Sequence, residues 1–224
     1  MRAVGEQRAV PARAERFLTP AGSGEAELIE KRSKFIARVV PAGDENAAKD
    51  EIARVRAKYH DARHNCWCYI IRGGPDRYSD DGEPQGTAGL PMLEVFRRGG
   101  IFDVCCVVTR YFGGILLGPG GLSRAYSGAA GLALADAGVT EMRLLDCMEI
   151  VCPYNLLTRV KAEIESSGGV TADIEYGGNA VFSILLPAGR ADDFNKRLSD
   201  VSAGTVYGVV TGKRFASQQR GPKS

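Results

Sequence analysis

The 224-residue chain has no strong excess of charge of either sign. Its formal net charge is only +2, from 29 Lys and Arg against 27 Asp and Glu, and the two signs are nearly balanced in each half of the chain. Many nucleic-acid-binding domains carry a marked basic excess. Any contact with nucleic acid would therefore have to come from a local basic patch.

Long apolar runs are also missing. No stretch reaches the roughly 18 apolar residues that suggest a membrane-spanning helix. The first residues, MRAVGEQRAVPARAERF, lack the apolar centre of a signal peptide. We therefore expect a cytoplasmic protein without membrane contact, with residues 1–20 as a mobile lead and residues 215–224 as a polar tail.

The usual residues of metal and redox sites are scarce. The only two histidines, His60 and His64, lack the glutamate of an H-E-x-x-H zinc motif, and no two cysteines form a C-x-x-C pair. The cysteines stand in apolar stretches, as small buried side chains do. We expect no metal and no cofactor, and structural thiols in a reducing compartment; these thiols are Cys66, Cys68, Cys105, Cys106, Cys147 and Cys152.

The pattern of apolar residues predicts two α+β domains, residues 21–140 and residues 141–214. In the first domain we expect strands over 25–31, 34–40, 64–71 and 103–109. Helices are expected over 44–59 and 87–97, and from the glycine-rich turn to about 137. The second domain is expected to follow a β-α-β-β-α-β order, with strands over 142–152, 170–176, 180–186 and 205–210 and helices over 154–165 and 192–201. That order is the ferredoxin-like unit.

A glycine-rich turn between the strand over 103–109 and the following helix is the first candidate site. Its residues Gly113, Gly114, Gly118, Gly120 and Gly121 permit close backbone approach, and Pro119 suits a first helical turn. A helix N-terminus attracts anions, and Arg110 and Arg124 flank the turn. The alternative is a strand-to-helix corner that merely requires glycine dihedrals. The spacing fits neither a dinucleotide fingerprint nor a Walker loop.

An acidic loop, SDDGEPQG over residues 79–86, is the second candidate. Asp80, Asp81 and Glu83 suit cation binding, acid–base chemistry or capping of the next helix; a solvated turn is the other interpretation. If this loop meets the glycine-rich turn, Arg110 or Arg124 would be the natural partner of these carboxylates, and His64 would point toward them.

A strip of basic residues in the first 63 positions is the third candidate, because such side chains contact phosphates. Simple exposure on alternating strand positions and on the outer face of a helix explains the same residues. The strip comprises Lys31, Arg32, Lys34, Arg38, Arg54, Arg56, Lys58 and Arg63.

Four stretches together resemble the YigZ/IMPACT family: KRSKFIA, HNCWCY, SDDGEPQGTAGLPML and VVTRYFGGILLGPGGLSRAY. They lie within residues 29–138, the region that the resemblance covers, and they bring Thr87 and Tyr111 into the candidate ligand-binding set. The resemblance implies that the first domain adopts the fold of the second domain of a small-subunit ribosomal protein. It implies that the second domain resembles the last, ferredoxin-like domain of elongation factor G.

The resemblance further implies a role in regulating translation, with RNA or the ribosome as the expected partner and no assigned reaction. The alternative is an enzyme or sensor for a small phosphorylated or anionic ligand at the glycine-rich turn. A protein-binding adaptor that uses the sheet of the second domain is a third hypothesis. The sequence does not indicate an oligomeric state.

Overall fold

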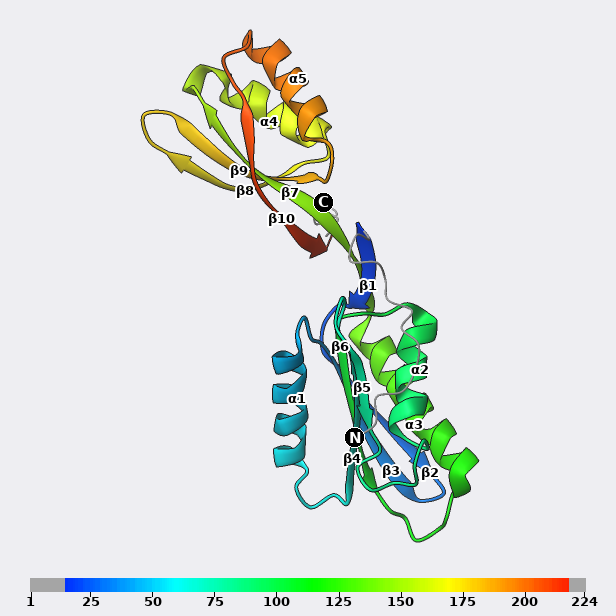
Figure 1. The fold of residues 1–224 in the computed structure, drawn as a ribbon. Coiled ribbons are helices and arrows are strands. Elements are labelled where there is room, and N and C mark those ends of the chain that lie inside the picture. Colours follow the sequence, from blue (N-terminus) through cyan, green and yellow to red (C-terminus); the bar gives the residue numbers. More distant parts are fainter. Residues whose placement is uncertain (1–14, 218–224) are drawn as a thin grey trace. The chain divides into compact units, whose positions relative to one another are not determined.

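The computed structural model describes residues 15–217, and they divide after Glu141 into two compact α+β units (Figure 1). The predicted α+β class is confirmed. The expected lead over residues 1–20 is only partly covered. Its first 14 residues lie outside the described range, whereas Arg16–Pro20 forms strand β1, which is anchored where the Phe102 amide donates to the Leu18 carbonyl at 2.8 Å.

The first unit is a three-layer structure around one antiparallel sheet, with strand order β2-β3-β6-β4-β5. Helices α2 and α3 cover one face and helix α1 covers the other (Figure 1). The elements are β2 (Gly24–Glu30), β3 (Ser33–Pro41), α1 (Glu45–Lys58), β4 (His64–Ile70), β5 (Asp76–Ser79), α2 (Gly89–Gly99), β6 (Val104–Tyr111) and α3 (Gly118–Ala137).

Local sequence explains most of these boundaries. Asp44, the first residue of the helix expected over 44–59, caps α1, because its carboxylate accepts a hydrogen bond from the Ala47 amide at 2.8 Å. Helix α3 lies close to the sheet, and a Cβ added at Gly24 would overlap the backbone of Ala133 and Ala137. Alternating residues of β4 supply both faces of the sheet: Cys66 and Cys68 face α2 and α3, and Tyr69 faces α1.

Strand β5 is a departure from the sequence prediction, which expected no strand between residues 71 and 103. The four residues Asp76–Ser79 pair with Trp67–Ile70 at the edge of the sheet. A strand this short gives too few alternating positions to identify from sequence.

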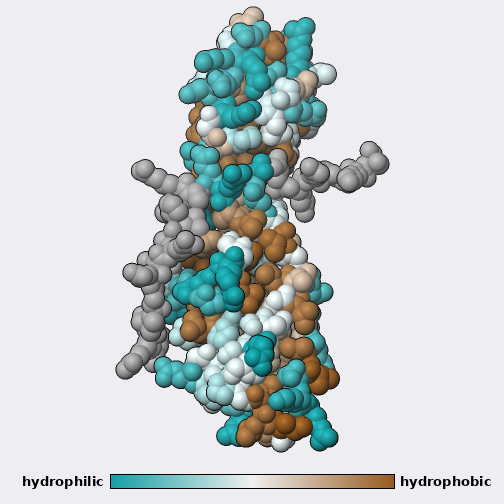
Figure 2. Space-filling view, turned by 90° about the vertical axis from the view of Figure 1, so that its right-hand side faces the viewer, coloured by the Kyte–Doolittle hydropathy of each residue, from teal (hydrophilic) through white to brown (hydrophobic). Residues whose placement is uncertain are grey.

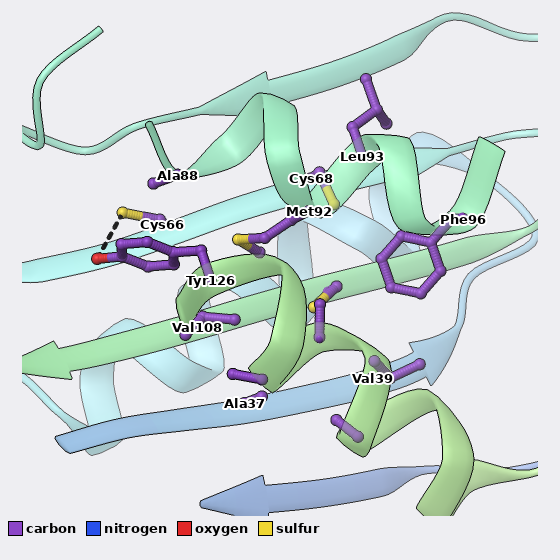
Figure 3. Packing of buried hydrophobic residues seen from close by; sticks show 14 of the residues in the cluster. Ala37, Val39, Cys66, Cys68, Ala88, Met92, Leu93, Phe96, Val108 and Tyr126 are labelled. Atoms are coloured by element: carbon purple, nitrogen blue, oxygen red, sulfur yellow. Dashed lines mark hydrogen bonds between the residues drawn. The ribbon is translucent and has the colours of Figure 1, made fainter. Parts of the chain in front are cut away.

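The core between the sheet and its two covering helices contains aromatic, sulfur-containing and small side chains (Figure 3). Tyr126 of α3 is fully buried against Phe35, with ring centroids 5.1 Å apart in an edge-to-face arrangement. Its hydroxyl lies 3.4 Å from the Cys66 Sγ. Burial, followed by the neighbouring Cys66, raises the pKa of Tyr126, so the phenol stays protonated at physiological pH.

The second unit has the ferredoxin-like arrangement expected from its element order. Its antiparallel strands lie in the order β8-β9-β7-β10, and α4 and α5 cover a core centred on Phe182 and Phe194. The elements are β7 (Val139–Cys152), a 3₁₀ turn (Tyr154–Leu156), α4 (Leu157–Ser166), β8 (Val170–Tyr176), β9 (Ala180–Pro187), α5 (Ala191–Ser202) and β10 (Gly208–Ser217).

Strand β10 extends well beyond the predicted strand over 205–210 and takes in the start of the predicted tail. Ser217 pairs with Met142, so residues 215–217 belong to the sheet. The rest of the predicted tail lies outside the described range. Within that range, no helix combines the length and apolar character required to cross a lipid bilayer.

Candidate functional site

One end of the first unit collects almost all of the predicted site residues. Strand β6 ends there beside the start of β3 and of β4, because Tyr111 pairs with Lys34 and Arg110 with His64. Helix α1 ends at this same end of the sheet, and helices α2 and α3 begin there (Figure 1). We call it the loop end; it comprises residues 30–33, 59–64, 80–88 and 111–121.

Asp80 uses its carboxylate to organise its own loop. Oδ1 accepts hydrogen bonds from the Ala88 and Gly89 amides at 3.0 and 2.9 Å, and Oδ2 accepts from the Gly86 amide at 2.8 Å. Ala88 precedes α2, so Asp80 supplies from a distance the cap that this helix lacks locally. Thr87 closes the same turn by donating to the Pro84 carbonyl at 2.6 Å.

Asp81 ties the acidic loop to β4 and α1. It adopts a left-handed φ of 43° before Gly82, and the Glu83 amide donates to the Asp80 carbonyl across the resulting turn. Oδ2 of Asp81 accepts from the Asn65 amide at 2.7 Å, and Oδ1 accepts from Arg56 at 2.6 Å. The Nδ1 of His64 lies 2.8 Å from the Asp81 carbonyl oxygen. His64 therefore lies at the loop, as predicted, beside its backbone.

Glu83 and Arg110 form a buried ion pair that joins the acidic loop to the end of β6. Their side chains are 3% and 7% exposed, and Arg110 Nη1 donates to Glu83 Oε1 at 2.6 Å. The Tyr126 hydroxyl donates to the same oxygen at 2.9 Å. The acidic loop therefore meets the end of β6, and of the two candidate arginines Arg110 is the partner. Both charges are used within the protein.

The glycine-rich turn is held against the β2–β3 turn. A Cβ added at Gly113 would overlap the backbone of Arg32 and Ser33, and the Gly113 amide donates to Ser33 Oγ at 3.2 Å. Arg110 Nη2 also lies 3.4 Å from Ser33 Oγ. The sequence did not single out Ser33 or Tyr126, although both lie within the family-like stretches.

The start of α3 is open to solvent. Leu117 stands at the capping position and no side chain caps the helix, while Gly118, Pro119 and Gly120 are exposed. A Cβ on Gly120 would lie 3.5 Å from Arg124 Nη1, so this exposed guanidinium lies beside the first helical turn. The arrangement offers unsatisfied amides and a positive charge to an anion. Ligand binding by these residues stays a prediction.

The basic strip divides into paired and unpaired cations. Lys34 pairs with Glu27, Arg38 with Glu25 and Glu51, Arg54 with Glu51, and Arg56 with Asp81. These pairings engage four of the eight cations and so reduce the predicted phosphate-binding strip, because the neighbouring carboxylates compete for the cations. Across residues 15–217 no ion pair involves the remaining members or Arg124; these unpaired cations are Lys31, Arg32, Lys58, Arg63 and Arg124.

Apolar side chains accompany these cations at the loop end. Ile29, Phe112 and Leu116 are 64%, 55% and 82% exposed. In the space-filling view, hydrophobic and hydrophilic side chains lie next to each other at this lower end of the first unit (Figure 2). The surface at the loop end thus combines unpaired cations with exposed apolar side chains. Tyr111 is engaged with Asp61, to which its hydroxyl donates at 2.8 Å.

The cysteines are free thiols, and five of the six are buried as expected from the sequence; Cys147 is half-buried. Burial raises the pKa of Cys66, Cys68 and Cys105 above the ordinary value, which disfavours the nucleophilic thiolate. Within residues 15–217, no group of three or more His, Cys, Asp or Glu side chains is arranged to hold a metal ion.

Comparison with known proteins covers both units. The Impact N-terminal domain matches residues 31–134, and a domain of unknown function (DUF1949) matches residues 150–205. The chain is 36% identical over 197 residues to the IMPACT family member YigZ of Escherichia coli, covering 86% of this chain and 96% of that protein. It is 35% identical over 191 residues to the IMPACT family member YvyE of Bacillus subtilis, covering 84% and 88%.

A solved structure described as that of a hypothetical protein agrees with these matches. It is 34% identical, has a TM-score of 0.59, and the match covers 89% of this chain and 98% of that one. The stretches that carried the sequence resemblance lie within the matched regions, and both units are represented. The chain belongs to the IMPACT family.

Proposed function

We propose that this chain is a translation-associated regulatory protein that binds RNA, free or on the ribosome, through the loop end of its first unit. Membership of the IMPACT family supports the translation-related role. The observation that carries the RNA contact is the division of the basic residues. Four cations of the strip have carboxylate partners, whereas the other four, together with Arg124, lie in or next to the loop end and have no ion pair among residues 15–217.

Unpaired cations are the residues best suited to phosphate contacts. A guanidinium or ammonium group that already has a carboxylate partner must lose it to bind phosphate, whereas Lys31, Arg32 and Arg124 carry no such cost. Phosphate contacts supply most of the affinity in non-specific nucleic-acid binding. A protein with a net charge of only +2 can therefore bind RNA locally at the loop end.

The β2–β3 turn presents two of these cations to solvent. Lys31 and Arg32 have φ values of 44° and 65°, the left-handed region that normally favours glycine. Each such residue costs about 1–2 kcal/mol relative to an unstrained one. Positive φ at both central residues is the geometry of a type I′ turn, the usual two-residue connection of a β-hairpin, and this turn leaves both cations exposed.

The test is the salt dependence of RNA binding. Affinity for an oligouridine of about 12 nucleotides is measured by fluorescence anisotropy between about 50 and 200 mM KCl. Five phosphate contacts predict a slope of log affinity against log salt of about −3.5, or a loss of about 100-fold across this range. Arg124→Gln should reduce the slope by about 0.7.

The matched control is Arg54→Gln. Arg54 is also an exposed arginine, but its guanidinium is paired with Glu51 at 2.6 Å. We expect this variant to bind with the wild-type slope. Absence of binding at low salt, a slope near zero, or equal effects of Arg124→Gln and Arg54→Gln would contradict the proposal.

A second candidate function is a sensor or enzyme for a small anionic ligand at the start of α3. The uncapped, exposed first turn beside Arg124 favours it. A thermal-shift screen of inorganic phosphate and nucleotides tests it, because ligand at 100 times its dissociation constant stabilises by about 2.7 kcal/mol. A ligand-induced shift that Arg124→Gln abolishes, with no RNA binding by the wild type, would favour this function over the first.

A catalytic role of the acidic loop is the least supported part of that alternative. Asp80, Asp81 and Glu83 each accept at least two hydrogen bonds from the protein itself. This pattern favours a structural role that shapes the loop end, and we assign no reaction. We place the protein in the cytoplasm because its free thiols suit a reducing compartment.

A further inference from the structure

Phe112 is the large exposed aromatic side chain at the loop end. It follows the last residue of β6, and 55% of its surface is accessible. Single exposed apolar side chains are common. Phe112 differs because its surroundings hold the ring in place while leaving more than half of it open.

One contact touches the Phe112 ring, and a second holds the backbone next to it. The guanidinium carbon of Arg110 lies 5.5 Å from the ring centroid, and Arg110 is itself held by the buried Glu83. On the other side in sequence, Gly113 lies directly against the Arg32 backbone. The ring therefore packs on an arginine whose position is fixed by Glu83. The loop that carries Phe112 also touches the β2–β3 turn, which carries the unpaired Arg32.

We propose that the loop end takes single-stranded RNA, with one base stacked on the Phe112 ring and neighbouring phosphates on Arg32 and Arg124. This inference rests on the proposed RNA binding and names the class of RNA. Exposed aromatic rings beside cations are the usual means of binding unpaired bases. A base inside a duplex is already stacked on both faces, and the narrow major groove of A-form RNA excludes side chains.

The neighbouring apolar residues fit the same ligand. Ile115 and Leu116 are 41% and 82% exposed on the same loop as Phe112. Apolar side chains gain nothing from phosphates, but they can cover the apolar faces of unstacked bases. A duplex would present its phosphates to the loop end and leave these side chains in contact with charge.

The first experiment compares Phe112→Leu, Phe112→Trp and the wild type for binding to oligouridine of about 12 nucleotides and to an RNA duplex of equal length. Leucine keeps apolar area but lacks a π-face, and tryptophan keeps the π-face. We expect Phe112→Leu to lose about fivefold or more in affinity for the single strand. The salt slope should stay unchanged, because phosphate contacts set it.

The second experiment measures tryptophan fluorescence of Phe112→Trp during titration with oligouridine. The wild type is the control, because its single tryptophan, Trp67, packs against the core on the α1 face of the sheet. We expect quenching in Phe112→Trp beyond that of the wild type, with affinity at least equal to that of the wild type. Far-UV circular dichroism checks that each variant is folded.

The outcomes separate this inference from the proposed function. Salt-dependent RNA binding that Phe112→Leu leaves intact, or equal affinity for duplex and single strand, overturns the stacking inference alone. Lack of extra quenching in Phe112→Trp also overturns it. Absence of RNA binding by the wild type overturns both. If the wild type and Phe112→Leu capture a protein partner equally well, the ligand of Phe112 is an apolar protein surface, and the stacking inference is overturned.

Discussion

Substitution of Glu83 by glutamine tests whether the buried ion pair holds the loop end together. Glu83→Gln removes the negative charge while keeping nearly the same size and shape. Arg110 then keeps a positive charge in a site where its side chain is 7% exposed. Its other polar neighbour there is Ser33 Oγ at 3.4 Å, a weak substitute for a carboxylate.

The expected loss in the free energy of unfolding is about 3 kcal/mol. Removing one partner of a buried ion pair typically costs about 3–5 kcal/mol, because the other charge stays buried without compensation. Glutamine offers Arg110 and Tyr126 an acceptor oxygen, which favours the lower end of the range. For a domain with a total stability of about 5–15 kcal/mol, this is a large fraction.

The fluorescence of Trp67 provides the assay, because the single tryptophan of the chain lies in the first unit and reports its unfolding. The free energy of unfolding falls by about 1–3 kcal/mol per molar urea, so a loss of about 3 kcal/mol lowers the urea concentration at the unfolding midpoint by about 1–3 M. Arg110→Met should cost a similar amount, because it leaves Glu83 without its cation.

The double variant Glu83→Gln/Arg110→Met is the decisive control. It removes both charges, so it should be more stable than the sum of the single losses predicts, with a coupling energy within the usual 0.5–3 kcal/mol for residues in contact. A Glu83→Gln midpoint equal to that of the wild type would refute the reasoning. Additive losses in the double variant would show that the two side chains do not depend on each other.

Three other residues of the first unit give sharp expectations for stability. Gly113→Ala should destabilise the first unit by about 1–3 kcal/mol, because its Cβ would overlap the Arg32 backbone; Gly22→Ala, with open space around position 22, is the matched control in the same urea assay, and equal midpoints would contradict the packing. Asp80→Ala should cost about 2 kcal/mol by removing the acceptor for three amides, and retention of the wild-type midpoint would count against its capping role. Burial works to raise the pKa of Glu51, but hydrogen bonds from Arg54 and Arg38 outweigh it and lower that pKa. The resulting stabilisation is present above the unfolded pKa and is lost as pH falls through the folded pKa. Glu51→Gln should therefore flatten the decline in stability below about pH 4.5. If the variant and the wild type lose stability equally as the pH falls through this range, Glu51 does not have the lowered pKa.

The fold was largely predictable because its signals are local. The Asp44 cap, the apolar alternation around Cys66 and Cys68, and the glycine after Ala137 mark element boundaries without tertiary information. Strand β5 lacks such signals, since Asp76–Ser79 is short and depends on pairing with β4. The extension of β10 likewise depends on its partner β7 rather than on its own polar sequence.

The candidate site was predictable in location but less so in detail. Charge alone suggested Arg110 or Arg124 as the partner of the acidic loop if the two loops met. Arg110 is the partner because strand β6 delivers it to the buried side. Pairing within the basic strip depends on strand register. Arg38 stands directly opposite Glu25 across β2 and β3, which the sequence alone does not state.

The sequence did not identify Phe112 as a candidate, because an aromatic residue at the end of a buried strand is expected to lie in the hydrophobic core. The signal for exposure was the following Gly113-Gly114 pair, which ends the strand and turns the chain away from the core. The left-handed conformation of Lys31 and Arg32 was equally hidden, because neither residue type predicts it. A count of charges in the sequence therefore does not show which cations and apolar side chains share one exposed surface.

Amide chemical-shift mapping by NMR during titration with oligouridine tests the central claim most directly. The account predicts shifts concentrated at Lys31, Arg32, Phe112 and residues 113–124, with weaker effects along α1 near Arg54. Shifts confined to residues 142–217, or no shifts at low salt, would contradict the assignment of RNA binding to the loop end.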